Sequence, residues 1–225
     1  MRIVAIIQAR MNSQRLPGKV LMDICGHPML WHVINRLMSK SKLLSDLVVA
    51  TTYHTSDTVI TKVCHDWNIK CYRGSESNVM DRYYRAAKES KADIVVRITA
   101  DCPCIDPTIV DRTIEYYLEN KFEYATFGNI GVPLVPDYPD GFDCEVFSFK
   151  TLEKVNSKIL SMQDREHVGR YMHNCLSYGF LQFYSKLPVK LSVDTKKDLQ
   201  RVRLVFSELG SDFFIWDVIK YFEED

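Results

Sequence analysis

Three short runs of apolar, largely β-branched residues constrain the fold of this chain most strongly. They lie at residues 3–8, 47–52 and 94–99, and none of them alternates regularly between apolar and polar residues. A strand that is buried on both faces has such a continuous run, whereas a strand with one solvated face alternates. Residues 28–38, between the first two runs, place apolar side chains at helical spacing. The pattern predicts an α/β fold, a mostly parallel sheet with helices on both faces.

The same criteria predict the remaining elements. We expect further helices at residues 56–67, 78–90, 107–119, 162–175, 196–208 and 212–222, and further strands at 69–72, 144–148, 180–184 and 189–193. Residues 122–139 are rich in Gly and Pro and are expected to be irregular. We therefore expect a single domain, residues 1–225, with a core at about 1–121 and 189–225 and an inserted lid region at about 122–188.

Composition excludes several classes of protein. The 225 residues include 29 Lys and Arg and 29 Asp and Glu, so the formal net charge is zero, which argues against a nucleic-acid-binding protein. No apolar run approaches the roughly 18 residues of a membrane span, so no membrane insertion is expected. The N-terminal residues lack a signal peptide's apolar region and cleavage site. Seven scattered cysteines without a C-x-x-C pair favour reduced thiols in a cytoplasmic protein, with neither disulfides nor a zinc site.

A basic loop follows the first expected strand. Residues 1–42 hold seven basic residues and one acid, Asp23, and three of the cations, Arg10, Arg15 and Lys19, fall within ten residues. Backbone N–H groups of such a loop can cradle phosphate oxygens, and Arg and Lys suit a polyphosphate. The G-x-x-x-x-G-K-[ST] pattern of a P-loop is absent. A solvated basic loop is the alternative, but the position after the first strand favours a phosphate site.

Two aspartates end apolar runs that are far apart in the sequence. Asp101 follows the run at 94–99, and Asp194 follows the run at 189–193. Carboxylates at these positions suit Mg²⁺, which binds oxygen ligands together with substrate phosphates. Asp106, before Pro107, is the better candidate for a helix N-cap, which leaves Asp101 available. Asp194 alone also fits the cap of the helix expected from residue 196. No G-x-S-x-G or G-x-G-x-x-G motif is present, so neither a serine nucleophile of that type nor a dinucleotide cofactor is expected.

Polar residues gather in the expected insertion. They are Asp140, Asp143, Glu145, Arg165 and His167. Carboxylates, an arginine and a histidine suit recognition of a hydroxylated or anionic molecule, and a salt-bridged surface is the alternative. The other histidines show no metal-ligand pattern.

Several sequence blocks together are similar to one known family. They are Ile6-Ile7-Gln8-Ala9-Arg10, Arg15-Leu16-Pro17-Gly18-Lys19-Val20-Leu21, Val48-Val49-Ala50-Thr51-Thr52, Asp81-Arg82-Tyr83-Tyr84, Arg97-Ile98-Thr99-Ala100-Asp101-Cys102-Pro103, Tyr138-Pro139-Asp140-Gly141 and Arg165-Glu166-His167-Val168. Over nearly its whole length the chain resembles the cytidylyltransferases of the SpsF type of spore coat polysaccharide biosynthesis, which are related to the CMP-Kdo and CMP-sialic acid synthetases. The resemblance implies a Rossmann-like nucleotide-diphospho-sugar transferase fold.

The resemblance also implies an activity and a set of site residues. The activity is Mg²⁺-dependent transfer of CMP from CTP to a sugar, sugar phosphate, phosphonate or other small acceptor in surface polysaccharide or glycoconjugate biosynthesis, with release of pyrophosphate. A homodimer is compatible with it. By similarity, catalysis falls to Arg15, Lys19 and Asp101; nucleotide binding to Gln8, Ala9, Arg10, Ser13, Arg15, Lys19, Ser75, Asp81, Arg82 and Ala100; acceptor binding to Asp140, Asp143, Glu145, Arg165 and His167; and metal binding to Asp101 and Asp194.

Three other functions are compatible with parts of the pattern. A glycosyltransferase that uses a nucleotide sugar would usually carry an Asp-x-Asp motif after a strand, and Asp101-Cys102-Pro103 lacks it. A non-catalytic nucleotide sensor would be expected to lose Lys19 or Asp101, and both are present. The same chemistry on another base stays open. The chain departs from the family at Asn12, where Gly is common, at Cys104, where an aliphatic residue is usual, and at residues 128–136, which match nothing in it and leave the acceptor open.

Overall fold

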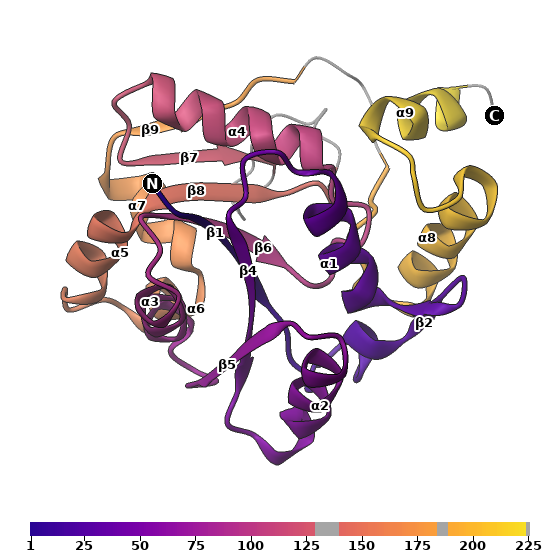
Figure 1. The fold of residues 1–225 in the computed structure, drawn as a ribbon, viewed down its shortest axis with the longest axis horizontal. Helices are drawn as coiled ribbons and strands as arrows, with labels where there is room; N and C mark the ends of the chain where they lie inside the picture. Colours follow the sequence, from indigo (N-terminus) through magenta and orange to yellow (C-terminus); the bar gives the residue numbers. More distant parts are fainter. Residues whose placement is uncertain (129–139, 184–188, 224–225) are drawn as a thin grey trace.

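The computed structural model describes residues 1–128, 140–183 and 189–223. Within them, seven strands form one sheet in the order β5-β4-β1-β6-β8-β7-β9 (Figure 1). The strands are β1 (Ile3–Gln8), β4 (Asp46–Thr52), β5 (Lys70–Gly74), β6 (Ile94–Thr99), β7 (Tyr124–Phe127), β8 (Cys144–Ser148) and β9 (Tyr178–Phe180). β1 pairs in parallel with β4 and β6, and β4 with β5, whereas β8 is antiparallel to both β6 and β7. The prediction of a mostly parallel sheet is confirmed.

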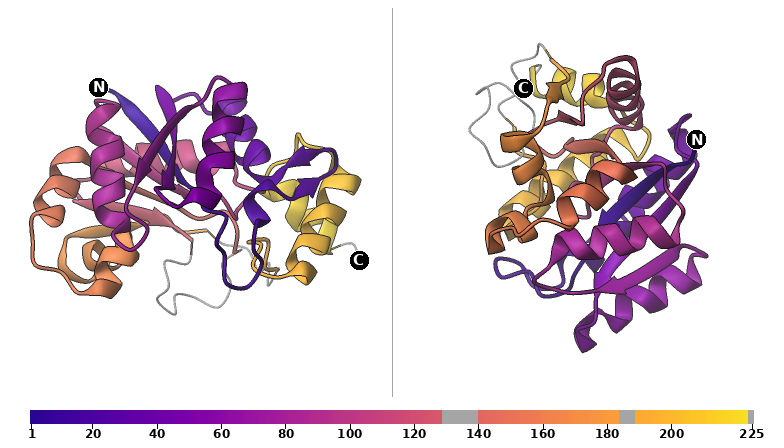
Figure 2. Two further views of the ribbon diagram at one scale, coloured as in Figure 1. Left: turned by 90° about the horizontal axis from the view of Figure 1, so that it is seen from below. Right: turned by 90° about the vertical axis from the view of Figure 1, so that its left-hand side faces the viewer.

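Helices cover both faces of this sheet, as the two views of Figure 2 show. They are α1 (Met29–Lys40), α2 (Thr58–Asp66), α3 (Val79–Glu89), α4 (Pro107–Glu119), α5 (Phe149–Asn156), α6 (Met162–Glu166), α7 (Val168–Cys175), α8 (Lys196–Leu209) and α9 (Ile215–Glu223), with short 3-10 turns η1 (Lys19–Leu21) and η2 (Thr55–Asp57). A separate small hairpin joins β2 (Asp23–Ile24) to β3 (His27–Pro28). No helix of the described part of the chain is long and apolar enough to span a membrane.

The first strand shows why its sequence does not alternate. Ile3, Ala5 and Ile7 pack into one core, with α1, α2, α4, α8 and α9, while Val4 and Ile6 pack into a second core, with α3, α5 and α7. Every one of these side chains is buried. Because each face of the strand meets an apolar layer, successive residues are all apolar, and the side chains still alternate in direction.

The segment predicted as an insertion continues the sheet over its described part. β8 pairs with β6, β7 with β8 and β9 with β7, and α5 and α7 pack on the same core as α3. β7 falls within residues 122–139, so the expectation of an irregular segment is wrong for Tyr124–Phe127, and α5 was not predicted. Residues 129–139 lie outside the described residues. They include all but residue 128 of the stretch 128–136, which matches nothing in the family.

Two further boundaries differ from the sequence-based expectation. The helix expected at 162–175 is divided into α6 and α7 at His167, whose φ of −105° and ψ of 86° are not helical. Residues 189–193 form no strand, although Leu191 and Val193 are buried; their backbone N–H groups donate to the Asp140 and Asp101 carbonyls. A third expectation differs as well: the strand expected at 180–184 shares only Phe180 with β9, residues 181–183 form no strand, and residue 184 lies outside the described part.

Asp106 caps α4, as the sequence predicts. Its Oδ1 accepts from the backbone N–H groups of Thr108, at 2.7 Å, and Ile109, at 3.3 Å, while Oδ2 accepts from Ile215 N, at 2.7 Å, at the start of α9. The side chain is 0% exposed. One carboxylate therefore satisfies buried donors of two helices that are far apart in the sequence.

We expect Asp106→Ala to lower the free energy of unfolding by about 2–3 kcal/mol, because it removes a cap and leaves buried N–H groups unpaired. Urea denaturation followed by circular dichroism measures the change. Ser161→Ala, which removes the exposed N-cap of α6, is the matched control and should cost less than about 1 kcal/mol. Equal losses for the two variants would contradict this account of Asp106.

Candidate active site

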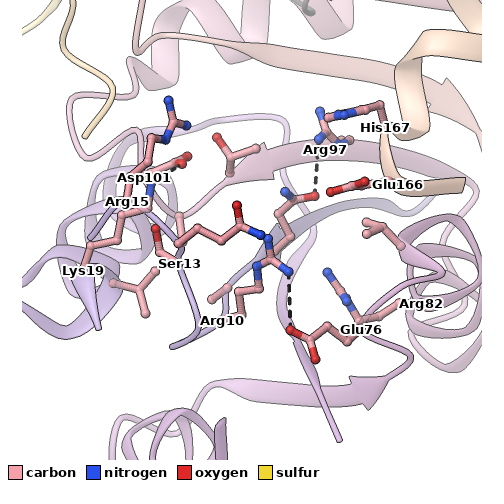
Figure 3. Close-up of a pocket in the computed structure, with 17 residues that line it drawn as sticks. Arg10, Ser13, Arg15, Lys19, Glu76, Arg82, Arg97, Asp101, Glu166 and His167 are labelled. Carbon is pink, nitrogen blue, oxygen red and sulfur yellow. Dashed lines mark hydrogen bonds and ion pairs between the residues drawn. The ribbon is translucent and has the colours of Figure 1, made fainter. Parts of the chain in front are cut away.

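Two cavities meet at the carboxyl ends of β1 and β6. The first, of about 470 Å³, lies between the loop after β1, the start of α3 and the α6–α7 junction (Figure 3). The second, of about 570 Å³, reaches from β6 to α7 and the segment before α8. The residues that line both are Arg15, Arg97, Thr99, Asp101 and His167. Ligands of open α/β sheets bind at this edge, and each volume suits a small molecule.

The basic loop after β1 is held in place by its backbone. Met11 N donates to Asp57 Oδ1 at 2.7 Å, and Gly18 N donates to Met11 O at 2.7 Å. Asp57 is itself buried and accepts from Thr52. Gly18 has a φ of +75°, a conformation that side chains with a Cβ rarely adopt. The loop therefore presents Arg15 and Lys19 to the cavities from an anchored backbone.

Lys19 connects the two aspartates that the sequence singled out. Its Nζ donates to Asp101 Oδ2 at 2.8 Å, to the Val193 carbonyl oxygen at 2.6 Å and to Asp194 Oδ1 at 3.2 Å. Lys19 is only 7% exposed. The predicted convergence of Asp101 and Asp194 is thus present in the structure, although the two residues lie in different parts of the chain.

Asp194 is surrounded by cations. Its Oδ1 also accepts from Arg15 Nη2 at 2.7 Å, and its Oδ2 accepts from Lys190. Burial would raise the pKa of Asp194, but hydrogen bonds and charge from Lys190 and Lys19 outweigh it and lower the pKa below its usual value. Thr195 and Asp198 form the capping box of α8, so the alternative role of Asp194 as that helix's cap is excluded.

The geometry fits a divalent metal at Asp101 and Asp194. Two carboxylates already hold one cation, the Lys19 ammonium, between them. Their oxygens are the hard ligands that Mg²⁺ prefers, and a bound polyphosphate would supply the rest of its coordination. No cluster of three or more metal-ligating side chains occurs among the described residues, so these two carboxylates would depend on substrate oxygens.

The far end of the first cavity combines donors, acceptors and small apolar side chains. Arg82 is 3% exposed, donates to the Ser75 carbonyl at 2.6 Å and points its guanidinium toward the cavity (Figure 3). Glu76 lies opposite Arg82, and its Oε1 is 3.4 Å from Arg10 Nη1. Ala9 and Val79 line the same cavity. A slot of this kind suits a planar, polar-edged ring, with donors and acceptors at the edge.

Arg97, which lines both cavities, forms a buried ion pair. Arg97 Nη1 donates to Glu145 Oε1, and Arg97 Nη2 lies 3.3 Å from Gln8 Oε1. The Glu145 side chain is 4% exposed. Burial alone would lower the pKa of Arg97, but the Glu145 carboxylate raises it well above its usual value, so the guanidinium stays charged. A Cβ at Gly169 would lie 2.0 Å from Glu145 Oε2, so only glycine fits at the start of α7.

Most residues expected at the site line one of the two cavities. The first contains Gln8, Ala9, Arg10, Ser13, Arg15, Lys19, Arg82, Ala100, Asp101 and His167, and the second contains Asp140, Asp143, Glu145 and Asp194 together with Arg15, Asp101 and His167. Glu145 lines the second cavity, and its carboxylate is paired with Arg97.

Three expected site residues line neither cavity. Ser75 Oγ accepts from Asn78 N in the turn before α3, Asp81 pairs with Arg85 at 2.7 Å, and Arg165 donates to the Lys158 carbonyl at 2.8 Å and to Asn156. These contacts hold a turn, a helix surface and the end of α5, and the assignment of the three residues to the site stays a prediction.

Sequence reasoning missed several polar residues that line the cavities, and the following are the charged ones outside the predicted sequence blocks or inside the sheet. Arg97 and Glu76 line the first, and Arg97, Arg170 and Lys190 line the second. Arg97 had a signal, because a charged residue inside a doubly buried strand needs a buried partner. Lys190 and Arg170 had none, since isolated cations in a mixed-charge segment are usually solvated.

Comparison with known proteins points to the same family that the sequence blocks resemble. The cytidylyltransferase family model matches residues 4–203. The spore coat polysaccharide biosynthesis protein SpsF of Bacillus subtilis is 29% identical over 219 residues, which cover 92% of this chain and 88% of SpsF.

Two solved structures share the fold. A cytidylyltransferase from Leptospira borgpetersenii superposes with a TM-score of 0.91 at 29% identity, over 100% of this chain and 94% of its own. A CMP:2-keto-3-deoxy-manno-octonic acid synthetase complexed with CTP superposes with a TM-score of 0.72 at 20% identity, over 93% and 100% of the two chains. The anchored basic loop, the paired aspartates and the match over most of the sequence lead to one conclusion: this chain belongs to the cytidylyltransferase family and is a nucleotidyltransferase.

Proposed function

We propose that this enzyme transfers the cytidylyl group of CTP to a small hydroxylated acceptor and releases pyrophosphate. The observation that supports it most is the junction of the two cavities. Arg15 and Asp101 line both, and Lys19 joins Asp101 to Asp194 at the same place. A polyphosphate bound from one side and an acceptor bound from the other would meet there.

CTP occupies the first cavity in this proposal. The triphosphate lies at Arg15 and Lys19, because these are the cations of the first cavity that pair with the aspartates. The nucleoside lies toward Ala9, Val79 and Arg82, where the cavity has small apolar walls and a polar edge. Arg15 offers a planar fork and Lys19 a point charge, and the two together neutralise a polyphosphate.

The reaction is an in-line displacement at the α-phosphorus. An acceptor hydroxyl oxygen forms a new bond to the α-phosphorus and its proton passes to water, while the bond from the α-phosphorus to the oxygen bridging to the β-phosphorus breaks and its electron pair leaves with pyrophosphate. Arg15 and Lys19 stabilise the charge that develops on the leaving group. Asp101 and Asp194 would hold Mg²⁺, which when bound withdraws charge from phosphate oxygens. Because the protein forms no covalent intermediate, its contribution is to position the two substrates and to neutralise the charge that develops.

The acceptor occupies the second cavity. Asp140 and Asp143 offer oxygen acceptors, and Lys190 and Arg170 offer donors. Burial raises the pKa of Asp140, and its carboxyl already accepts from Ser192 at 2.9 Å. Such a mixed lining suits a molecule with several hydroxyl groups. We therefore propose a sugar or sugar-like acceptor, in the synthesis of a surface polysaccharide or glycoconjugate; the similarity to SpsF supports that assignment.

Pyrophosphate release, measured with each of the four nucleoside triphosphates, Mg²⁺ and a panel of sugars, sugar phosphates and phosphonates, tests the proposal. We expect release with CTP and one acceptor class, and less than about one-hundredth of that rate with UTP, about 3 kcal/mol of discrimination. Pyrophosphate release with a different nucleoside triphosphate and not with CTP would mean that the enzyme uses another base. Failure of CTP to bind, measured by calorimetry with Mg²⁺, would overturn it.

A further inference from the structure

Lys19 has no hydrogen-bond donor left for a substrate. A lysine ammonium carries three N–H donors, and three acceptors surround this one: Asp101 Oδ2, the Val193 carbonyl and Asp194 Oδ1. The side chain is almost entirely buried, so solvent competes little for these donors. A lysine that binds a triphosphate must therefore give up at least one of these partners when the nucleotide arrives.

Both carboxylates already accept hydrogen bonds from cations. Asp194 accepts from Arg15 and Lys19 on Oδ1 and from Lys190 on Oδ2, and Asp101 gives Oδ2 to Lys19. A metal ion that approaches both residues in the absence of nucleotide meets an ammonium already between them. Displacing that ammonium would leave a buried cation without a partner, which is costly in a protein interior.

We propose that Lys19 is a resident cation that occupies, in the free enzyme, the position between Asp101 and Asp194 that a divalent metal takes in the substrate complex. This inference rests on the proposed function, because the triphosphate of CTP is what accepts Lys19 and Arg15 when they leave the aspartates. The free enzyme then binds metal weakly, and CTP and metal bind together. Linkage makes the effect reciprocal: each ligand raises the affinity for the other by the same factor.

Binding of Mn²⁺ to the nucleotide-free protein tests this proposal without measuring activity. Electron paramagnetic resonance measures the concentration of free Mn²⁺ at each point of a titration. We expect Lys19→Met to bind Mn²⁺ at least tenfold more tightly than the wild-type protein, because it opens the place between the two carboxylates. Lys19→Gln, which also lacks the charge, serves if the methionine variant does not fold. The double variant Lys19→Met/Asp101→Asn should lose the gained affinity.

Lys190→Met is the matched control. It removes the same charge from the same neighbourhood, but Lys190 contacts Asp194 and not Asp101. We expect a change in Mn²⁺ affinity below threefold. Equal gains for Lys190→Met and Lys19→Met would overturn the proposal, because they would reflect net charge alone. Unchanged Mn²⁺ affinity in the Lys19 variants would overturn it as well.

Calorimetric titration of the wild-type protein with CTP separates this proposal from the proposed function. We expect CTP to bind at least tenfold more tightly with Mg²⁺ than with EDTA. Absence of CTP binding under both conditions would contradict the proposed function itself. CTP binding that is equal under both conditions would leave the nucleotide site standing and overturn the exchange of Lys19 for the metal.

Discussion

Asp101→Asn is expected to lower kcat/KM by at least ~10³-fold, which corresponds to about 4 kcal/mol of transition-state stabilisation. The change keeps the size of the side chain but removes the charge that faces Lys19 and that would hold the metal. Charge neutralisation around the transferred phosphoryl group is the largest contribution a protein makes to such a reaction. Pyrophosphate release with CTP and the acceptor found in the panel measures the loss.

Asp66→Asn is the control for that experiment. Asp66 is exposed and contacts only His65 among the ion pairs of the described residues, far from the cavities. Its turnover should equal that of the wild-type enzyme. If Asp101→Asn stayed within about threefold of the wild-type rate, a difference of less than about 1 kcal/mol, the assignment of Asp101 as a metal ligand would be wrong.

Breaking the buried pair of Arg97 and Glu145 should have the largest effect on stability. We expect Glu145→Ala to lower the free energy of unfolding by about 3–5 kcal/mol, because it leaves the Arg97 charge buried and without a counter-ion. Arg97→Met should lower the free energy of unfolding by a comparable amount, because it leaves the Glu145 carboxylate buried and without a counter-ion. The double variant Arg97→Met/Glu145→Ala should lose much less than the sum of the single losses, since neither charge is then buried without a counter-ion.

Urea denaturation of the four proteins forms a double-mutant cycle that measures the coupling. Gly169→Ala provides an independent variant, because its Cβ would press on Glu145 Oε2 and on the Tyr124 hydroxyl. Losses that simply add, or a loss below about 1 kcal/mol for Glu145→Ala, would mean that solvent screens the pair.

Much of the fold follows from the sequence because its strands are buried on both faces. β1, β4 and β6 produce continuous apolar runs, and Asp106 with Pro107 marks the start of α4. β7 was missed because it is a four-residue strand between a helix and a glycine. Residues 189–193 have the composition of a strand, yet their backbone hydrogen bonds go to Asp140 and Asp101 in loops.

The site is predictable in its charges but less so in its contacts. Arg15, Lys19, Asp101 and Asp194 stand out because they follow expected strands. The hydrogen bonds among these residues cannot be predicted in the same way, because Lys19 and Asp194 are 175 residues apart and only the folded chain brings them together. Arg165 illustrates the reverse: a charged residue beside His167 suggests binding, but its guanidinium holds the end of α5.

Transfer of label from CTP tests the central claim most directly. The wild-type enzyme is incubated with Mg²⁺, the acceptor panel and CTP labelled with ³²P at either the α- or the γ-phosphate. The account predicts that the α-label moves into the acceptor and that the γ-label leaves in pyrophosphate, with both transfers lost in Asp101→Asn. Appearance of the γ-label in the acceptor, or of label only in free phosphate, would contradict nucleotidyl transfer at this site.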